Sequence, residues 1–246
     1  ACLERYPELD ALARATGALR IATDDVLAAM ADTVSPQGIL AVCRQLDVTL
    51  AEVLSRGPRL VAVLCRVQDP GNAGTILRAA DSAGADAVVF TEGSVDPYNP
   101  KTVRSTAGSL FHVPFVIGAD PAELAHQLRG AGVGVLAADG YGPVDLDALQ
   151  DESAARRLGG GAQGETAPEG RSSGEGEAAP SYVLEAPTAW LFGNEAQGLS
   201  DAELALADAR VAVPLYGEAE SLNVGTAATV CLYASARAQR RGQRTG

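Results

Sequence analysis

From residue 60 onward, short apolar runs alternate with segments that have the composition and spacing of amphipathic helices. The run at 60–64 is apolar at every position, which is typical of a strand buried on both faces of a parallel sheet. Repeated strand–helix units predict a doubly wound α/β fold, in which ligands bind beyond the carboxyl ends of the strands. The predicted strands are 60–64, 87–90, 113–116, 133–138, 188–192 and 209–213, and the predicted helices are 73–83, 100–106, 121–129, 201–206 and 224–238.

The segment before this pattern has a different rhythm. Apolar residues at helical spacing over 2–15 are followed by a predicted short strand at 19–22, a helix at 24–31 and a buried strand at 39–43. We expect residues 1–47 to be the later half of a small α/β domain. Its N-terminal part is expected to be missing, because the chain opens in mid-helix style and without Met.

Three further segments depart from the strand–helix pattern, which extends over residues 58–240: one precedes it, one interrupts it and one follows it. Residues 48–57 are expected to be a linker with a helical stretch, ended by a Gly-Pro pair. Residues 151–180 are rich in Gly, Ser, Glu, Ala and Pro and contain almost no large apolar side chain, which predicts a disordered surface insertion. Residues 241–246 form a basic tail, of the kind that is more often solvated than functional but that could touch phosphate.

The composition excludes some classes of protein. The net charge of −12 argues against a protein that binds nucleic acid over its whole surface. No apolar run reaches the roughly 18 residues that a membrane helix needs. The four cysteines lie far apart without a CxxC pair or a histidine cluster, so we expect buried, reduced thiols in a cytoplasmic protein and no zinc site.

Three polar, glycine-containing loops follow predicted strands, at 69–80 (DPGNAGTILRAA), 192–200 (FGNEAQGLS) and 213–226 (VPLYGEAESLNVGT). In the first loop, Asn72 is expected to cap the next helix. Arg78 could reach a phosphate or a ribose, although a surface ion pair is the more common role of such a residue.

The second loop has glycines on either side of an Asn-Glu pair, and Ser200 at its end is a good helix cap. In the third loop, Ser221 and Asn223 are good N-cap types for the following helix. The chain has neither the GxGxxG pattern of dinucleotide-binding folds nor the GxxxxGK[ST] pattern of a phosphate-binding P-loop.

Four short motifs follow one another between residues 58 and 240. They are NxGxxxR at 72–78, RSTAGS at 104–109, GNEAQGL at 193–199 and ESLNVGTAA at 220–228. In their order and approximate spacing they resemble the motifs of the SpoU/TrmH family, the SPOUT-class RNA 2′-O-ribose methyltransferases. The front segment is similar to the L30-like α/β domain that many members carry, here truncated. The 151–180 insertion departs from the family pattern but falls between motifs.

The resemblance implies a parallel-sheet SPOUT fold whose C-terminal segment forms a deep trefoil knot, a feature that is very rare among proteins. It also implies a homodimer through the knot region and the final helix, with RNA as the partner. The three loops would converge on S-adenosyl-L-methionine in a bent shape. The implied contacts are Phe192, Gly193, Asn194, Val213, Pro214, Ser221, Leu222 and Asn223, with Thr106 and Gly108 lining the pocket less directly.

The implied reaction moves a methyl group from a sulfonium to a ribose 2′-hydroxyl, which is a poor nucleophile and needs help. By the same resemblance Arg78 is the central catalytic residue. A guanidinium normally stays protonated, so we expect Arg78 to orient the ribose and stabilise the forming oxyanion rather than act as a base. Glu195 would fix its loop or hydrogen-bond Arg78 or Asn72. The helping residues are Asn72, Glu195, Ser221 and Asn223, and no metal is implied.

Two other functions are alternatives to methyl transfer. An RNA-binding ribosome-assembly factor could keep the fold without turnover, but the complete set of motif residues favours an active enzyme. An unrelated nucleotide-binding enzyme, such as a dehydrogenase, would need the missing GxGxxG pattern. Ribosomal RNA is the favoured target and tRNA the second, because an added front domain suits a large structured RNA.

Overall fold

The computed structural model describes residues 2–31, 33, 35–159 and 182–240. The chain divides into two compact units, Ala1–Gln45 and Leu46–Gly246. The predicted basic tail at 241–246 lies outside the described residues.

The first unit contains three short helices, α1 (Cys2–Arg5), α2 (Pro7–Ala15) and α3 (Asp24–Met30). The helical predictions are confirmed, with a break before Pro7, which occupies the first turn of α2. The predicted strands at 19–22 and 39–43 are wrong. Both segments are coil, with Ile21 and Val42 largely exposed, because no described strand of this unit pairs with them. The expected small sheet is therefore absent from the described part of the unit.

The second unit is built on a seven-stranded sheet in which every pairing is parallel. The strand order is β3-β2-β1-β6-β4-β7-β5, so β1 lies beside β6 although more than 120 residues separate them in the chain. This arrangement confirms the predicted parallel α/β class. The strands are β1 (Leu60–Leu64), β2 (Ala87–Thr91), β3 (Phe115–Ala119), β4 (Gly134–Ala138), β5 (Val144–Asp145), β6 (Thr188–Phe192) and β7 (Ala209–Ala212).

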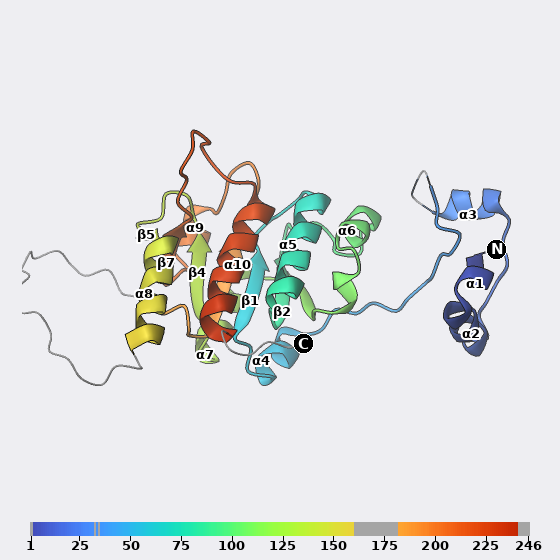
Figure 1. The fold of residues 1–246 in the computed structure, drawn as a ribbon, viewed down its shortest axis with the longest axis horizontal. Coiled ribbons are helices and arrows are strands. Elements are labelled where there is room, and N and C mark those ends of the chain that lie inside the picture. Colours follow the sequence, from blue (N-terminus) through green and yellow to red (C-terminus); the bar gives the residue numbers. More distant parts are fainter. Residues whose placement is uncertain (1, 32, 34, 160–181, 241–246) are drawn as a thin grey trace, which may run out of the picture. The chain divides into compact units, whose positions relative to one another are not determined.

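Helices cover both faces of the sheet. Across one face α8, α10, α5 and α6 follow one another, and the other face carries α4, α7 and α9 (Figure 1). Alternate residues of β1 serve the two layers, as the two-residue period of a strand requires. Leu60, Ala62 and Leu64 pack toward α5 and α10, whereas Val61 and Val63 pack toward α4 and α7. The helices are α4 (Leu50–Ser55), α5 (Pro70–Ala83), α6 (Pro100–Ser105), α7 (Pro121–Gly130), α8 (Leu146–Gly159), α9 (Asp201–Leu204) and α10 (Val224–Arg240).

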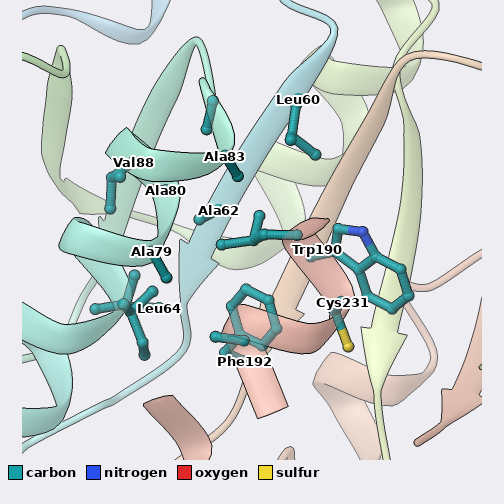
Figure 2. Packing of buried hydrophobic residues seen from close by; sticks show 14 of the residues in the cluster. Leu60, Ala62, Leu64, Ala79, Ala80, Ala83, Val88, Trp190, Phe192 and Cys231 are labelled. Carbon is teal, nitrogen blue, oxygen red and sulfur yellow. The ribbon is translucent and has the colours of Figure 1, made fainter. Parts of the chain in front are cut away.

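The larger core cluster lies between the sheet and the pair α5 and α10 (Figure 2). The rings of Trp190 and Phe192 on β6 stack with centroids 6.5 Å apart. The indole nitrogen of Trp190 donates a hydrogen bond of 2.9 Å to Ser235 on α10, so its polar atom is satisfied inside the core. Small residues let the helices approach closely. A Cβ added at Gly225 of α10 would lie 2.8 Å from Thr75 of α5.

The structure corrects the predicted start of α5. The helix begins at Pro70, and Asp69 caps it by accepting a 2.8 Å hydrogen bond from the backbone N–H of Asn72. Asp-Pro at the cap and first position is a favourable helix start, which the prediction treated only as a turn. Asn72 is therefore not the cap, and its side chain is available to other partners.

Two expected irregular segments are also partly regular. The predicted linker 48–57 contains α4, which belongs to the second unit, buries Val53 and carries a capping box between Thr49 and Glu52. Residues 151–159, expected to begin a disordered insertion, are the C-terminal part of α8, where Ser153 is buried against Glu185. Apolar Leu146 and Leu149 anchor this helix in the core. Residues 160–180 lie outside the described part of the chain.

The cysteines only partly follow the prediction of buried thiols. Cys65 and Cys231 are buried and unpaired, and burial raises the pKa of the Cys231 thiol to about 12. Cys43 is exposed, because the segment expected to be a buried strand is coil. Among the described residues, no helix combines the length and apolar character needed to cross a bilayer.

Candidate active site

The three loops singled out in the sequence meet at the carboxyl edge of the sheet. β1 and β6 are neighbours, so the loop after β1 lies beside residues 193–200. The third loop, 213–223, connects β7 to α10, and α10 packs along α5, which follows β1. Strand order and helix packing together bring the three segments to one place.

Glu195 links the second loop to the start of α5. Its Oε1 accepts hydrogen bonds from the backbone N–H of Asp69 (3.1 Å) and from Nδ2 of Asn72 (3.2 Å). Its Oε2 accepts a bond of 3.3 Å from the N–H of Gln68. The N-terminus of a helix favours a negative charge, which suits a carboxylate at this position. Of its two expected partners, Asn72 and Arg78, Asn72 is the one that Glu195 contacts.

Asn72 continues the contact to the third loop. Its Oδ1 accepts a 2.9 Å hydrogen bond from Nδ2 of Asn223. Oδ1 of Asn223 in turn accepts bonds from the N–H groups of Gly225 (2.9 Å) and Thr226 (3.3 Å), so Asn223 caps α10 as predicted. A single hydrogen-bonded chain, Glu195–Asn72–Asn223, therefore connects the second loop, α5 and the third loop.

The second loop is narrow because two glycines permit it. Asn194 and Gly198 exchange backbone hydrogen bonds of 3.1 and 2.8 Å, and Gly198 has a φ of +66°. A Cβ at Gly193 would lie 2.3 Å from the carbonyl carbon of Gly198, so no side chain fits there. The loop ends at Ser200, which caps α9 with a reciprocal bond to Glu203, as the sequence predicts.

Arg78 is exposed on α5, about 9 Å along the helix axis from Asn72. No hydrogen bond or ion pair joins its guanidinium to another described residue, so the surface ion pair that composition favours is not seen there. Gly74, four residues earlier on the same helix face, abuts Ser105, whose hydroxyl donates to the carbonyl of Pro70 at 2.8 Å. Arg78 therefore lies on the side of α5 that carries the RSTAGS segment.

The remaining expected site residues fall into two groups. Ser221 and Leu222 are exposed in the third loop, and Val213 and Pro214 are half-buried at its start. By contrast, the side chains of Phe192 and Thr106 point into the core. Thr106 is fully buried, and its hydroxyl donates to the carbonyl of Val103 at 2.7 Å. Both residues are fully buried, so neither side chain is exposed to a ligand in this structure.

Gly108 lies on the α6 side of α5 with a φ of +101°, and it precedes the short 3₁₀ turn 109–111. Asn194 faces inward, where its Nδ2 donates to the carbonyl of Arg66 at 2.9 Å and its Oδ1 accepts from the N–H groups of two loop residues. The Asn194 side chain therefore shapes the second loop from within.

Sequence reasoning missed two residues that shape the site, Asp69 and Arg66. The Asp-Pro dipeptide was a usable signal for Asp69 as a cap. Arg66 forms a two-point ion pair with Glu203, and nothing in the local sequence pairs these residues, which lie 137 positions apart. Burial acts to raise the pKa of Glu203, but hydrogen bonds from Arg66 and Ser200 outweigh it and hold that pKa below its usual value.

The sequence pattern of the SpoU rRNA Methylase family matches residues 59–233, which contain all four motifs and the whole site. The chain belongs to the SpoU rRNA methylase family.

Relatives within the family are similar over most of this chain. The 23S rRNA (guanosine(2553)-2′-O)-methyltransferase of Bacillus subtilis is 37% identical over 86% of this chain and 69% of that protein. The 23S rRNA (uridine(2479)-2′-O)-methyltransferase of Streptomyces viridochromogenes is 30% identical over 82% of this chain. The chain spans 61% of the length of this second relative.

Solved structures of the SpoU family share the fold. The methyltransferase AviRb of Streptomyces viridochromogenes in complex with the cofactor AdoMet is 31% identical, with a TM-score of 0.60 over 79% of this chain and 66% of that one. An rRNA methyltransferase of Sinorhizobium meliloti is 27% identical, with a TM-score of 0.70 over 98% of this chain and 79% of that one.

Proposed function

We propose that this SpoU family member transfers a methyl group from S-adenosylmethionine to a ribose 2′-hydroxyl of structured RNA, with ribosomal RNA as the first candidate. The observation that carries the proposal is the hydrogen-bonded chain Glu195–Asn72–Asn223, which joins three of the four family motifs at one edge of the sheet. Among the described residues, no group of His, Cys, Asp or Glu has the arrangement of a metal site.

The loops have the chemistry that this cofactor needs. Bound S-adenosylmethionine supplies a methyl group activated by a sulfonium centre. In the described part of the chain, residues 215–222 make no backbone–backbone hydrogen bonds, so their N–H and C=O groups can bond the polar edge of an adenine. Leu215 and Leu222 expose apolar surface in the same loop. The absence of a side chain at Gly193 lets the two arms of the second loop approach each other closely, which sets the shape of this wall of the proposed cofactor site.

Arg78 would act on the ribose from the neighbouring face of α5. Its guanidinium, which has no partner among the described residues, can orient the ribose and its phosphate and stabilise the negative charge that develops on the 2′-oxygen. Asn72 is held by Glu195 on one side and by Asn223 on the other, so its position relative to Arg78 is fixed. Ser221 is exposed beside these residues and can contact either ligand.

The ribosomal target rests on the relatives, whose names specify 23S rRNA, and on local charge. The chain carries a net charge of −12, yet α5 and α6 expose Arg78, Lys101 and Arg104 around the RSTAGS segment. Basic side chains around this segment suit contact with RNA phosphates near the modified nucleotide. Such a substrate would place the protein in the cytoplasm, with tRNA as the second candidate.

The knot and the dimer are parts of the same proposal. β7 lies on the far side of β4 from β6, whereas α10, which follows it, packs over β6, β1 and α5. This return of the chain across the carboxyl edge supports a C-terminal trefoil knot. Val230 and Tyr233 expose apolar surface on α10, which supports a homodimer through this helix.

Arg78→Ala tests the proposed reaction. We expect methyl transfer to fall by about 10²–10³-fold, as it does when one stabiliser of a developing oxyanion is removed, while S-adenosylmethionine affinity stays within about twofold. Tritiated-methyl transfer to total ribosomal RNA and to total tRNA, with calorimetric titration of the cofactor, measures both quantities. Arg56→Ala, an exposed arginine at the amino edge of the sheet, is the matched control.

Each outcome has a clear meaning. Full transfer by Arg78→Ala would refute the role given to this residue. Label in tRNA but not in ribosomal RNA would reverse the order of targets. Binding of RNA by the wild-type protein with no cofactor binding and no transfer would favour the assembly-factor alternative.

A further inference from the structure

Arg66, the second residue after β1, has an unusual backbone conformation. Its φ is +55°, in the left-handed region that residues with a Cβ rarely adopt. Non-glycine residues persist in this region where the surrounding structure imposes it, and they gather at functional sites. The left-handed turn directs both the carbonyl oxygen and the guanidinium of Arg66 toward the segment 194–203.

The guanidinium of Arg66 contacts the C-terminal end of the second loop and the helix that follows it. Nε and Nη2 donate to Oε1 and Oε2 of Glu203 at 2.9 and 2.7 Å, and Nη2 also lies 3.4 Å from the carbonyl oxygen of Gly198. The Glu203 side chain is 6% exposed, and its Oε2 additionally accepts bonds from the N–H and hydroxyl of Ser200. A two-point ion pair to a buried carboxylate fixes the direction of the guanidinium as well as its distance.

The backbone carbonyl of Arg66 contacts the N-terminal end of the same loop. The carbonyl oxygen of Arg66 accepts the 2.9 Å hydrogen bond from Nδ2 of Asn194. Arg66 therefore contacts the loop at Asn194 on one side and at Gly198 and Glu203 on the other. Glu195 projects between these two points and meets the backbone N–H groups that follow Arg66.

We infer that Arg66 is a positioning residue, which fixes both ends of the 193–199 loop so that Glu195 and the glycine turn keep their shape for the cofactor. The identity of the cofactor rests on the proposed function, whereas the positioning of the loop by Arg66 rests on contacts within the chain. Arg66 also forms one wall of a cleft of about 290 Å³ with Gln68, Asn194 and Gln197, so the guanidinium stands at the edge of the site rather than on a remote surface.

A second ion pair in the same unit provides a matched control. Arg129 donates from Nε to Oδ1 of Asp208 at 2.8 Å, and its Nη2 lies 2.7 Å from the same oxygen. It also donates to the carbonyl of Leu206, so it joins α7 to the segment before β7. Arg66 similarly joins the segment after β1 to α9. This pair is at the amino edge of the sheet, at the starts of β4 and β7.

The test compares Arg66→Gly, Arg66→Lys, Glu203→Gln and Arg129→Ala with the wild type. Glycine accepts a φ of +55° without strain, so Arg66→Gly removes the guanidinium while the backbone keeps its turn. We expect hydrogen exchange of the amides at 196–199 to accelerate at least tenfold, and the dissociation constant for S-adenosylmethionine to rise at least tenfold, in Arg66→Gly and Glu203→Gln. Arg66→Lys keeps one contact and should be intermediate, and Arg129→Ala should change neither quantity.

The two readouts separate this inference from the proposed function. Exchange at 196–199 that matches the wild type in both Arg66→Gly and Glu203→Gln would overturn the positioning role. Faster exchange in Arg66→Gly and Glu203→Gln, together with no binding of S-adenosylmethionine by the wild type, would support the positioning role of Arg66 and overturn the proposed function. If Arg66→Gly does not fold, Arg66→Lys and Glu203→Gln decide the result by the same criteria.

Discussion

Gly193→Ala is the smallest change that should disable the site, because it adds one methyl group where the backbone leaves no space. The new Cβ would lie 2.3 Å from the carbonyl carbon of Gly198 and 2.4 Å from the nitrogen of Leu199. Both are main-chain atoms, so no side-chain rotation relieves the overlap. The two arms of the loop must separate by about 0.7 Å to restore the 3.0 Å that Cβ atoms keep from such neighbours.

The cost follows from the bonds that this separation breaks. Asn194 and Gly198 exchange two backbone hydrogen bonds of 3.1 and 2.8 Å, which such a movement stretches to about 3.5 Å or more. Each bond contributes about 0.5–1.5 kcal/mol net, so the loss is about 2 kcal/mol. For a chain of this length, that corresponds to a fall of about 4–8 °C in Tm. Displacement of the loop by nearly an ångström should also lower the transfer rate by about 10–100-fold.

Thermal unfolding, cofactor titration and methyl transfer together check the prediction. Gly130→Ala, at the end of α7, is the matched control, because a Cβ there meets nothing within 4 Å. It should leave transfer unchanged and stabilise slightly, since alanine is the better helix former. An unchanged Tm and unchanged cofactor affinity in Gly193→Ala would refute the steric reasoning and the place of this turn in the site.

Two further predictions concern the site's connections. Asn223→Ala removes the cap of α10 and the bond to Asn72, so we expect a loss of about 1 kcal/mol together with a lower transfer rate. Thr49→Ala, which removes the cap of α4, should lose similar stability without loss of transfer; equal transfer in both variants would contradict the linking role of Asn223. Because the pKa of Glu203 is lowered in the folded protein, its stabilising contribution is present above the unfolded value of about 4.3 and is lost as pH falls through the folded pKa. Glu203→Gln should therefore be less stable at pH 7, by about 1–3 kcal/mol for a lost charged hydrogen bond, and less sensitive to acid in urea unfolding followed from pH 7 to pH 3.

The central strands were predictable because a strand that is buried on both faces is a continuous run of apolar residues in the sequence. Residues 60–64 and 188–192 are apolar runs bounded by polar turns, and both are strands at those positions. The same criterion failed at 39–43, where the apolar run has no neighbouring strand to pair with among the described residues. It also passed over β5, which is only two residues long and depends on β7 for its pairing. Apolar character identifies a strand only when a partner is present.

The site was predictable as a set of residues and not as an arrangement. Glu195 and Asn72 stand out by their motifs, but their contact depends on β6 lying beside β1, which no local pattern encodes. Arg66 was missed for the same reason, because its partner Glu203 is close only in the folded sheet. Its positive φ is equally hidden, since an arginine gives no sign of a left-handed turn.

The corrected cap of α5 explains how the side-chain amide of Asn72 can connect the first loop to both the second and the third. Because Asp69 accepts the backbone N–H of Asn72, the Asn72 side chain is not used by its own helix. Its amide can then donate to Glu195 with Nδ2 and accept from Asn223 with Oδ1. A carboxylate at this position could accept from Asn223 but could not donate to the Glu195 carboxylate, and a hydroxyl lacks the reach to bridge the two partners. An asparagine at the third position of a helix capped by aspartate is therefore the arrangement that couples the glycine loop to the loop before α10.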